Sequence, residues 1–309
     1  MKNTSLIQTV TKTAAAIVLT AGAFGVHAQS ADWQDQAISP VGNPIYFEDP
    51  RITTEARPVF MEHYLPRTFN FYNGGPGVAL GGSVQVYALQ LRYALTDRLA
   101  IIATKDGYIE FQPNHTLPHH YGFADLAAGL KYALIDDRDN QFILTPGFTV
   151  TLPTGSTEVF QGHGTGVENI FVSAEKGFDK FHLTGNLGAI IPNDFDHQTA
   201  QLHYSLQADY FLGQYFIPFL VANGYTVLSD GKNQGSQSLN AVPLNTEGYD
   251  LINFGSADAG GTTELTFGGG FRSKLTRNLD FGVAVEGGIV KPVGIFDSRV
   301  TVDFIWRFK

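Results

Sequence analysis

Two groups of side chains in this sequence have the types and spacing that chemistry requires. His203 and Ser205 lie two residues apart on one face of an extended segment, and Asn186 lies on the segment before it. A histidine base beside a serine nucleophile is typical of hydrolases, but it also needs a third group that orients the base and an oxyanion hole. Neither feature is visible in the sequence. Ester hydrolysis by His203 and Ser205 therefore remains an alternative interpretation.

The second group consists of histidines. His115, His119 and His120 cluster within residues 111–121, and His163 follows in a later loop. Three imidazoles can bind zinc, nickel or copper. No carboxylate or helical spacing accompanies them, so a polar surface loop is the favoured interpretation. The sequence thus predicts no catalytic residue, no metal and no cofactor.

Charged side chains recur along the chain on the polar face of alternating segments. When Lys274 is counted with the residues listed below, this face carries six basic and seven acidic side chains, so the charges nearly balance. Such groups could line a lumen and set a field across it, or they could pair with one another and fill a narrow interior. The predicted lining residues are Arg92, Asp125, Lys131, Glu175, Asp209, Glu264, Arg272, Asp280, Glu286, Arg299, Asp303 and Arg307.

The elements that must position these residues are long strands. Globular strands usually have about five or six residues, whereas a tilted membrane strand needs about ten. The last segment shows the pattern well, because Val300, Val302, Phe304 and Trp306 alternate with polar residues. Eleven strands are predicted near 83–95, 98–110, 122–134, 141–151, 167–177, 180–191, 200–212, 215–228, 263–275, 278–290 and 298–308. Within 98–110, Lys105-Asp106-Gly107 indicates a bulge.

The connections between these strands alternate between short polar turns and longer loops, which is the arrangement of outer-membrane barrels. The strand 83–95 runs toward a short turn, so an even barrel requires one more strand before it, which residues 59–72 can supply. The fold class is therefore an all-β, antiparallel, up-and-down transmembrane β-barrel of about twelve strands over residues 59–309. Strand 298–308 is expected to pair with 278–290 and with the strand near 59–72.

Aromatic residues on the apolar face gather near the short turns, where a membrane interface would favour them. A soluble β-sandwich offers no reason for this grouping. The residues are Tyr93, Tyr132, Phe142, Phe181, Tyr210, Phe271, Phe281, Trp306 and Phe308, and Lys309 follows the last of them.

The N-terminus indicates export. Lys2 and Lys12 precede an apolar run that ends at Ala28, which is typical of a signal peptide over residues 1–28. Cleavage leaves 18 basic and 29 acidic side chains, a net charge of −11, which argues against nucleic acid as a partner. Absence of cysteine excludes disulfides and thiol chemistry. The expected partners are outer-membrane lipid, small-molecule solutes and, through the C-terminal strand, the barrel-assembly machinery.

Two segments outside the strands could enter the barrel. Residues 29–58 form a periplasmic segment whose part 31–58 has four prolines and several aromatic residues, so it is either a plug at the periplasmic mouth or a loosely ordered tail. In loop 229–262, Tyr249–Phe254 is apolar for an exposed loop and could fold inward as a constriction.

Short motifs resemble a known family. Residues 123–134 (FADLAAGLKYAL), residues 144–155 (LTPGFTVTLPTG) and Gly164-Thr-Gly166 are similar, in this order, to motifs of outer-membrane proteins grouped with the phenol-degradation meta-pathway transporters. The likeness covers roughly residues 80–308, and Phe123-Ala124 stands where a glycine is usual. The resemblance implies a barrel porin for small molecules, aromatic or hydrophobic ones among them, with no catalytic residues.

The sequence therefore favours an outer-membrane channel for passive uptake or efflux of small molecules. No nucleotide-binding motif is present, which favours passive diffusion. A lipid hydrolase using His203 and Ser205, and a structural or adhesive barrel without conductance, are the alternatives.

Overall fold

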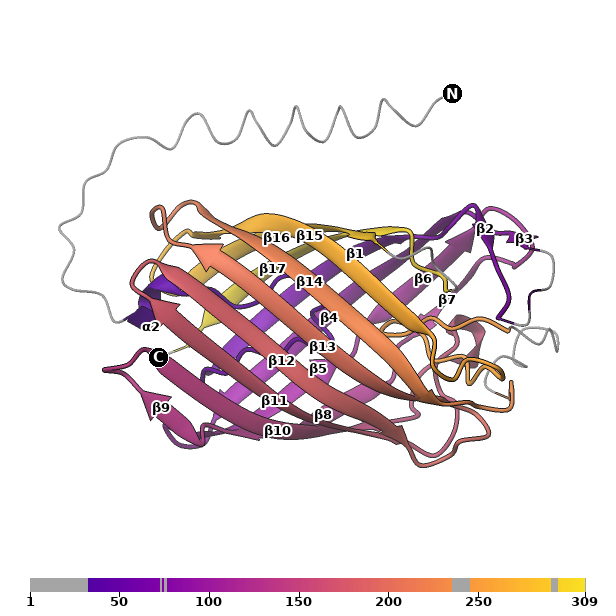
Figure 1. Ribbon diagram of the computed structural model, residues 1–309, viewed down its shortest axis with the longest axis horizontal. Coiled ribbons are helices and arrows are strands. Elements are labelled where there is room, and N and C mark those ends of the chain that lie inside the picture. Colours follow the sequence, from indigo (N-terminus) through magenta and orange to yellow (C-terminus); the bar gives the residue numbers. More distant parts are fainter. Residues whose placement is uncertain (1–32, 73, 75–76, 235–244, 290–293, 309) are drawn as a thin grey trace, which may run out of the picture. The chain divides into compact units, whose positions relative to one another are not determined.

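The strands close into one antiparallel barrel of twelve strands (Figure 1). The computed structural model describes residues 33–308 apart from 73, 75–76, 235–244 and 290–293. The ring closes at β1 (Glu55–Tyr64), which pairs with β17 (Ser298–Arg307) on one side and with β4 (Gly82–Ala94) on the other. Because β17 also pairs with β16, both predicted partners of the last strand are confirmed.

The remaining elements are given in chain order; β2 and β3 form a separate two-stranded sheet, and among the described strands β9 pairs only with β10. The first half contains α2 (Trp33–Gln36), β2 (Thr68–Phe69), β3 (Val78–Ala79), β5 (Leu99–Lys105), β6 (Tyr108–Pro113), β7 (His120–Phe123), β8 (Leu126–Tyr132) and β9 (Ile135–Asp137). The second half contains β10 (Phe142–Leu152), the 3-10 turn η1 (Thr157–Val159), β11 (Val167–Phe178), β12 (Phe181–Pro192), β13 (Ala200–Tyr210), β14 (Ile217–Ser229), β15 (Thr263–Lys274) and β16 (Leu279–Gly288).

Two predicted strands are interrupted, and the first strand is displaced. The strand expected near 59–72 runs instead over Glu55–Tyr64. The strand expected at 98–110 is divided into β5 and β6 by a bulge at Asp106-Gly107, where the Asp106 side chain accepts a hydrogen bond from the backbone N–H of Leu89 (2.9 Å). The strand expected at 122–134 is similarly divided into β7 and β8.

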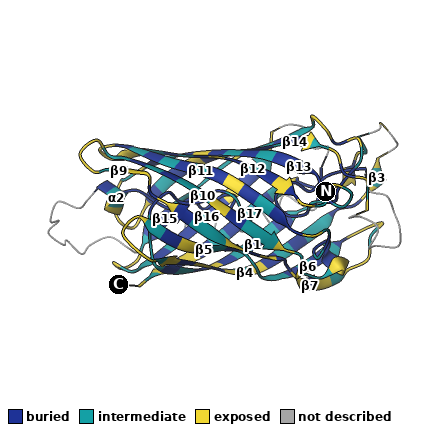
Figure 2. Cartoon of the chain, turned by 90° about the horizontal axis from the view of Figure 1, so that it is seen from below, coloured by how far each residue is buried: buried dark blue, intermediate teal, exposed yellow. Residues whose placement is uncertain are grey.

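The alternation of side chains sets an outer and an inner face (Figure 2). On β17, Phe304 and Trp306 point outward and are about half exposed, whereas Arg299 and Asp303 point inward and are buried. The apolar face therefore lies on the outside of the barrel, where lipid is expected, and the polar face lines the interior.

One end of the barrel carries the short turns, the helix α2 and the C-terminus (Figure 1). Thr96 and Thr276 stabilise two of these turns in the same way, since each hydroxyl accepts hydrogen bonds from the backbone N–H groups two and three residues later. Of the aromatic residues predicted at this end, six are exposed, namely Tyr93, Tyr132, Phe181, Tyr210, Trp306 and Phe308, and the other three are partly exposed.

The predicted signal peptide, residues 1–28, and Lys309 lie outside the described residues. No helix in the described part of the chain is long and apolar enough to cross a membrane.

Candidate functional site in the barrel interior

The twelve predicted lining residues all lie on the inner face, and all but Arg307 are buried. The structure brings only some of them together. Asp303 receives two hydrogen bonds from Arg272, both 2.9 Å, and Arg307 donates one to Asp280 at 2.8 Å. Most of the others contact residues that lie outside the strands. The expectation that the charges pair across the barrel therefore describes only part of the interior.

A segment from the N-terminal side of β1 fills part of the barrel interior. We call residues 33–54 the inserted segment. From Ala37 to Arg51 its residues are buried except for Ile45 and Tyr46, which are partly exposed. Three of its apolar side chains, Ile38, Val41 and Phe47, pack against Ile217, Phe219 and Val221 of β14 and Ala284 of β16. The segment is therefore packed against the inner wall of the barrel.

Wall side chains recognise the backbone of the inserted segment. Carbonyl oxygens at seven positions accept hydrogen bonds from donors on six different strands. The pairs are Lys274 to Ala37 (2.8 Å), Arg272 to Ser39 (3.1 Å), Arg57 to Pro40 (2.6 Å), Gln90 to Pro44 (2.6 Å), Ser173 to Glu48 (2.8 Å), Lys131 to Asp49 (2.7 Å) and Thr145 to Pro50 (2.6 Å). Since the segment makes no regular ladder of its own, these donors satisfy carbonyl groups that burial would otherwise leave unpaired.

Two carboxylates of the inserted segment form ion pairs inside the barrel. Glu48 lies between Arg92 of β4 and Lys131 of β8, and Asp49 pairs with Arg51 of the same segment. Burial raises the pKa of Glu48, but the charges of Arg92 and Lys131 outweigh it and lower the pKa to about 2. The Glu48 carboxylate is therefore ionised at any physiological pH.

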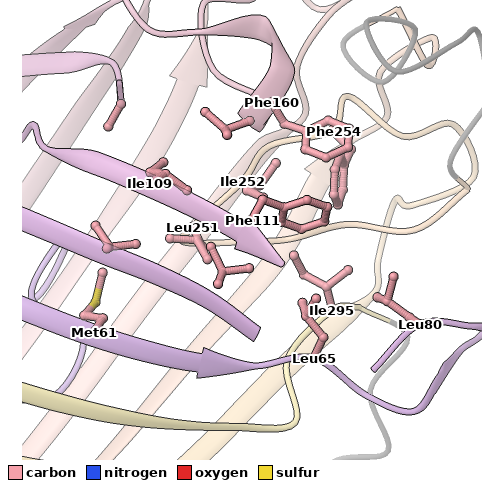
Figure 3. Close-up of a cluster of buried hydrophobic side chains, with 14 of the residues drawn as sticks. Met61, Leu65, Leu80, Ile109, Phe111, Phe160, Leu251, Ile252, Phe254 and Ile295 are labelled. Atoms are coloured by element: carbon pink, nitrogen blue, oxygen red, sulfur yellow. The ribbon is translucent and has the colours of Figure 1, made fainter. Parts of the chain in front are cut away.

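A second segment enters from the end opposite to the short turns. We call residues 245–256, between β14 and β15, the lumen loop. Leu251, Ile252 and Phe254 join a buried apolar cluster with Met61 of β1, Phe111 of β6 and Phe160 (Figure 3). Asp250 of the same loop pairs with Arg299 of β17. The apolar stretch Tyr249–Phe254 thus lies inside the barrel.

Glu247 fixes the shape of the lumen loop. Its carboxylate accepts hydrogen bonds from the backbone N–H groups of Phe254 (2.6 Å) and Gly248 (3.0 Å) and from the Thr199 hydroxyl (3.2 Å). Burial raises the pKa of Glu247 to about 7, even though these hydrogen bonds favour the ionised form. The protonation state of this side chain therefore changes near neutral pH.

The inserted segment and the lumen loop approach each other within the barrel. Pro44 and Ile45 of the segment and Leu251 of the loop line a cavity of about 20 Å³, which has room for roughly one water molecule. The centroid of the Tyr46 ring lies 5.1 Å from that of His203 and 6.1 Å from that of Tyr225, and the Tyr225 centroid lies 6.3 Å from that of Tyr249 in the lumen loop. Ile45 also packs against the apolar cluster that contains Leu251, so the two segments are in contact through this cluster.

The candidate catalytic pair is engaged in other contacts. His203 is hydrogen-bonded to Asn169 (2.8 Å), while the Ser205 hydroxyl accepts from Asn43 of the inserted segment (3.2 Å). Asn186, the third group considered, donates to Ser173 instead (2.8 Å). These contacts do not form a base and nucleophile pair.

Two of the loop histidines, His119 and His120, contact other protein groups. His119 is hydrogen-bonded to the backbone carbonyl of Pro113 (3.0 Å), and His120 lies 3.9 Å from Glu158. Among the described residues, no group of three or more His, Cys, Asp or Glu side chains is arranged to hold a metal ion.

Sequence reasoning missed several residues of the interior, chief among them Glu48, Arg57 and Asp250. Glu48 and Asp250 lie in segments without periodicity, so no pattern assigns them a face, whereas Arg57 lies in β1, two residues before residue 59, where the first strand was expected to begin. One available signal is the concentration of charge in Glu48-Asp49-Pro50-Arg51 within a segment otherwise rich in apolar and aromatic residues.

Comparisons with known proteins agree with this architecture. The sequence profile of a family named for the MetA pathway of phenol degradation matches residues 68–289. Among solved structures, the COG4313 outer membrane channel from Pseudomonas putida F1 is similar, with a TM-score of 0.59 and 14% identity over 88% of this chain and 100% of that one. This likeness shows a shared fold.

Two porins give weaker matches. The NanC porin has a TM-score of 0.48 and 7% identity, over 82% of this chain and 99% of that one. The KdgM porin in complex with disordered oligogalacturonate has a TM-score of 0.44 and 10% identity, over the same shares. No match was found among curated protein sequences.

Proposed function

This chain belongs to the family named for the MetA pathway of phenol degradation, and from that premise we propose that it is an outer-membrane channel for the passive passage of small molecules. The predicted lining residues are then residues of the pore wall. The inserted segment and the lumen loop act as two closures, which enter the pore from opposite ends.

The observation that carries this proposal is the polarity of the interior. Buried ion pairs are costly to desolvate, and apolar residues of similar volume often stabilise a protein as well or better. A barrel that only needed filling would therefore be expected to use apolar side chains. Here the wall instead presents Arg57, Arg92, Lys131, Arg272 and Arg299 to two segments that enter from outside the sheet. Such a wall suits water and polar solutes once these segments move.

The contacts between the wall and both closures are non-covalent. The inserted segment leaves the wall at Glu55, where β1 begins, and the lumen loop is continuous with β14 and β15. Either segment could move without breaking a pair of the twelve-stranded ladder. Such movement requires no nucleotide, which agrees with passive diffusion.

Planar-bilayer recording tests the proposal. The purified mature chain is compared with a variant that lacks residues 33–51, which keeps Thr54 and the whole of β1. We expect discrete current steps from both proteins, with larger or longer openings in the deletion variant. If neither protein gives current steps while both remain folded, the channel is excluded and a structural barrel is favoured.

The location in the outer membrane has its own test. Signal-peptide cleavage after Ala28 would give a mature N-terminus at Gln29. We expect N-terminal sequencing of the protein from the outer-membrane fraction to begin at this residue. Recovery of the chain from the soluble fraction with Met1 intact would contradict this.

A further inference from the structure

The carboxylate of Glu48 lies in a site made of buried wall cations. Arg92 donates to it through Nε at 2.9 Å and through Nη2 at 2.6 Å, and Lys131 donates through Nζ at 2.7 Å. Exposed fractions are 4% for Glu48, 3% for Arg92 and 1% for Lys131. Three donors from two different strands therefore converge on one carboxylate that belongs to neither strand.

The site is built into the wall, whereas its present occupant is not. Arg92 on β4 and Lys131 on β8 flank β5, whose facing residues at these positions are Ile102 and Ala100. Both β5 side chains are fully buried and uncharged, so the strand between the two cations offers no carboxylate. The cations would therefore stay in place, close together, if the inserted segment moved.

The wall by itself does not neutralise these two cations. Within the described part of the chain, Lys131 is ion-paired to Glu48 alone. Arg92 has a second partner in Glu55 at 3.7 Å, but Glu55 is shared with Arg307 at 3.5 Å. Withdrawal of Glu48 would thus leave two cations facing the lumen without a full counter-charge, which favours the binding of another anion in its place.

The geometry points to a binding site for small carboxylates between Arg92 and Lys131, in which Glu48 of the inserted segment stands in for the solute and must be displaced by it. This inference rests on the proposed channel function and names a substrate class for it: small organic acids in their anionic form.

The contact pattern favours a carboxylate. Arg92 binds the two oxygens of Glu48 with two of its N–H groups, which is the fork geometry that a planar carboxylate matches. Lys131 donates to Oε1 of Glu48, the same oxygen that accepts the hydrogen bond from Nε of Arg92, and adds a second positive charge there. A neutral amide of the same shape would offer only one acceptor oxygen to these three donors.

The site has a gating consequence. A solute must compete with a carboxylate that is tethered to the barrel, and tethering gives an effective concentration in the millimolar range or above for short linkers. Carboxylates should therefore bind weakly to the intact protein and more tightly once Glu48 is removed.

Chemical rescue tests the site without relying on conductance. In the full mature chain, Glu48→Ala removes the internal carboxylate and leaves its space empty. We expect this variant to unfold at a lower temperature than the native protein, and sodium acetate to raise that temperature by a few degrees. Acetamide, and sodium chloride at equal ionic strength, should not do so.

Two comparisons make the rescue specific. In the double variant Glu48→Ala/Arg92→Gln the acetate effect should be lost, because the fork that binds the carboxylate is gone. The native protein should respond to acetate much less, because Glu48 occupies the site. Equal effects of acetate and acetamide on Glu48→Ala, or no effect of either, would overturn the carboxylate site.

Ion selectivity supplies a second measurement in case Glu48→Ala does not fold. Glu48→Gln keeps the size of the side chain but frees both cations, so the reversal potential in a potassium chloride gradient should shift toward chloride. Asp35→Asn removes the same charge from helix α2, where the Asp35 side chain is exposed, and should leave the reversal potential unchanged. An equal shift in both variants would indicate a general charge effect and would refute the site.

The two proposals fail in different ways. Current steps with no acetate rescue and no specific shift in Glu48→Gln would leave the channel in place and remove the carboxylate site. Acetate rescue without any current would retain the site and exclude the channel.

Discussion

Asp250 of the lumen loop and Arg299 of β17 form a two-point ion pair inside the barrel, with N–O distances of 2.5 and 2.8 Å. Both side chains are buried, and His63 of β1 also contacts the guanidinium, at 3.0 Å. The pair ties a loop that has no regular secondary structure to a strand of the wall. It is therefore a polar attachment of the lumen loop to the barrel wall.

The first prediction concerns this attachment. Removing one partner of a buried ion pair costs about 3–5 kcal/mol, because the other charge is left without a partner. We expect Asp250→Asn to release the lumen loop, with faster cleavage of residues 245–256 by added protease and more frequent channel opening. The double variant Asp250→Asn/Arg299→Gln should be less destabilised than the sum of the two single changes. Strict additivity would show that the two residues do not interact in solution.

The second prediction concerns pH and Glu247. Its pKa is raised in the folded loop to about 7 from an ordinary value of 4.5, so the folded loop binds the proton more tightly than the released loop does. The stability that this group contributes is fully present below pH 4.5 and is lost as pH rises to about 7. Protease cleavage of the loop should therefore be slower at pH 5 than at pH 7.5.

Glu247→Gln serves as the control for this pH effect. The amide cannot ionise, so the difference in cleavage between pH 5 and pH 7.5 should become smaller. Tyr72, Tyr249 and Glu264 also interact electrostatically with Glu247, and the tyrosines stay neutral in this range. A pH difference that is unchanged in Glu247→Gln would assign it to another group.

The third prediction concerns the outer aromatic residues. Trp306 is 58% exposed on the outer face of β17 and stacks with Phe308, with ring centroids 6.4 Å apart. Trp306→Ala should lower the stability of the barrel in lipid vesicles by about 1 kcal/mol through the lost ring contact, and by more if the interface anchors the ring. Thr151→Ala, on β10, removes no aromatic ring and serves as the control. Equal losses in both variants would argue against an interface role.

The strands could be predicted from sequence because a barrel wall imposes a strict alternation on each of them. Phe304 and Asp303 must face opposite sides of β17 whatever lies inside the barrel. The same logic gave the partners of β17, since an even ring requires a strand before β4. Alternation says nothing, however, about the partner of an inward charge. Arg92 and Lys131 were correctly placed inward, but Glu48 could not be assigned to them because its segment has no period.

The final prediction uses two glycines to test the bulge that divides β5 from β6. Gly107 has a φ of +115°, and a Cβ at this position would lie 2.4 Å from the backbone oxygen of Tyr87. An L side chain is strained by such a conformation, at a cost of about 1–3 kcal/mol, and the contact with rigid backbone adds to it. Gly107→Ala should therefore lower the denaturant concentration at which the barrel unfolds.

Gly185 of β12 provides the matched control, because a Cβ there would meet only the Ser205 carbonyl oxygen, at 3.8 Å, which is an ordinary contact. Gly185→Ala replaces glycine within a strand of regular conformation and should leave the unfolding midpoint nearly unchanged or raise it slightly. Heat-dependent mobility on gels, which separates folded from unfolded barrels, measures both variants under the same conditions. If Gly107→Ala were as stable as Gly185→Ala, the chain at Asp106-Gly107 would have to relax into a continuous strand. The ladder between β4 and the segment 99–113 would then be unbroken, contrary to the bulge described above.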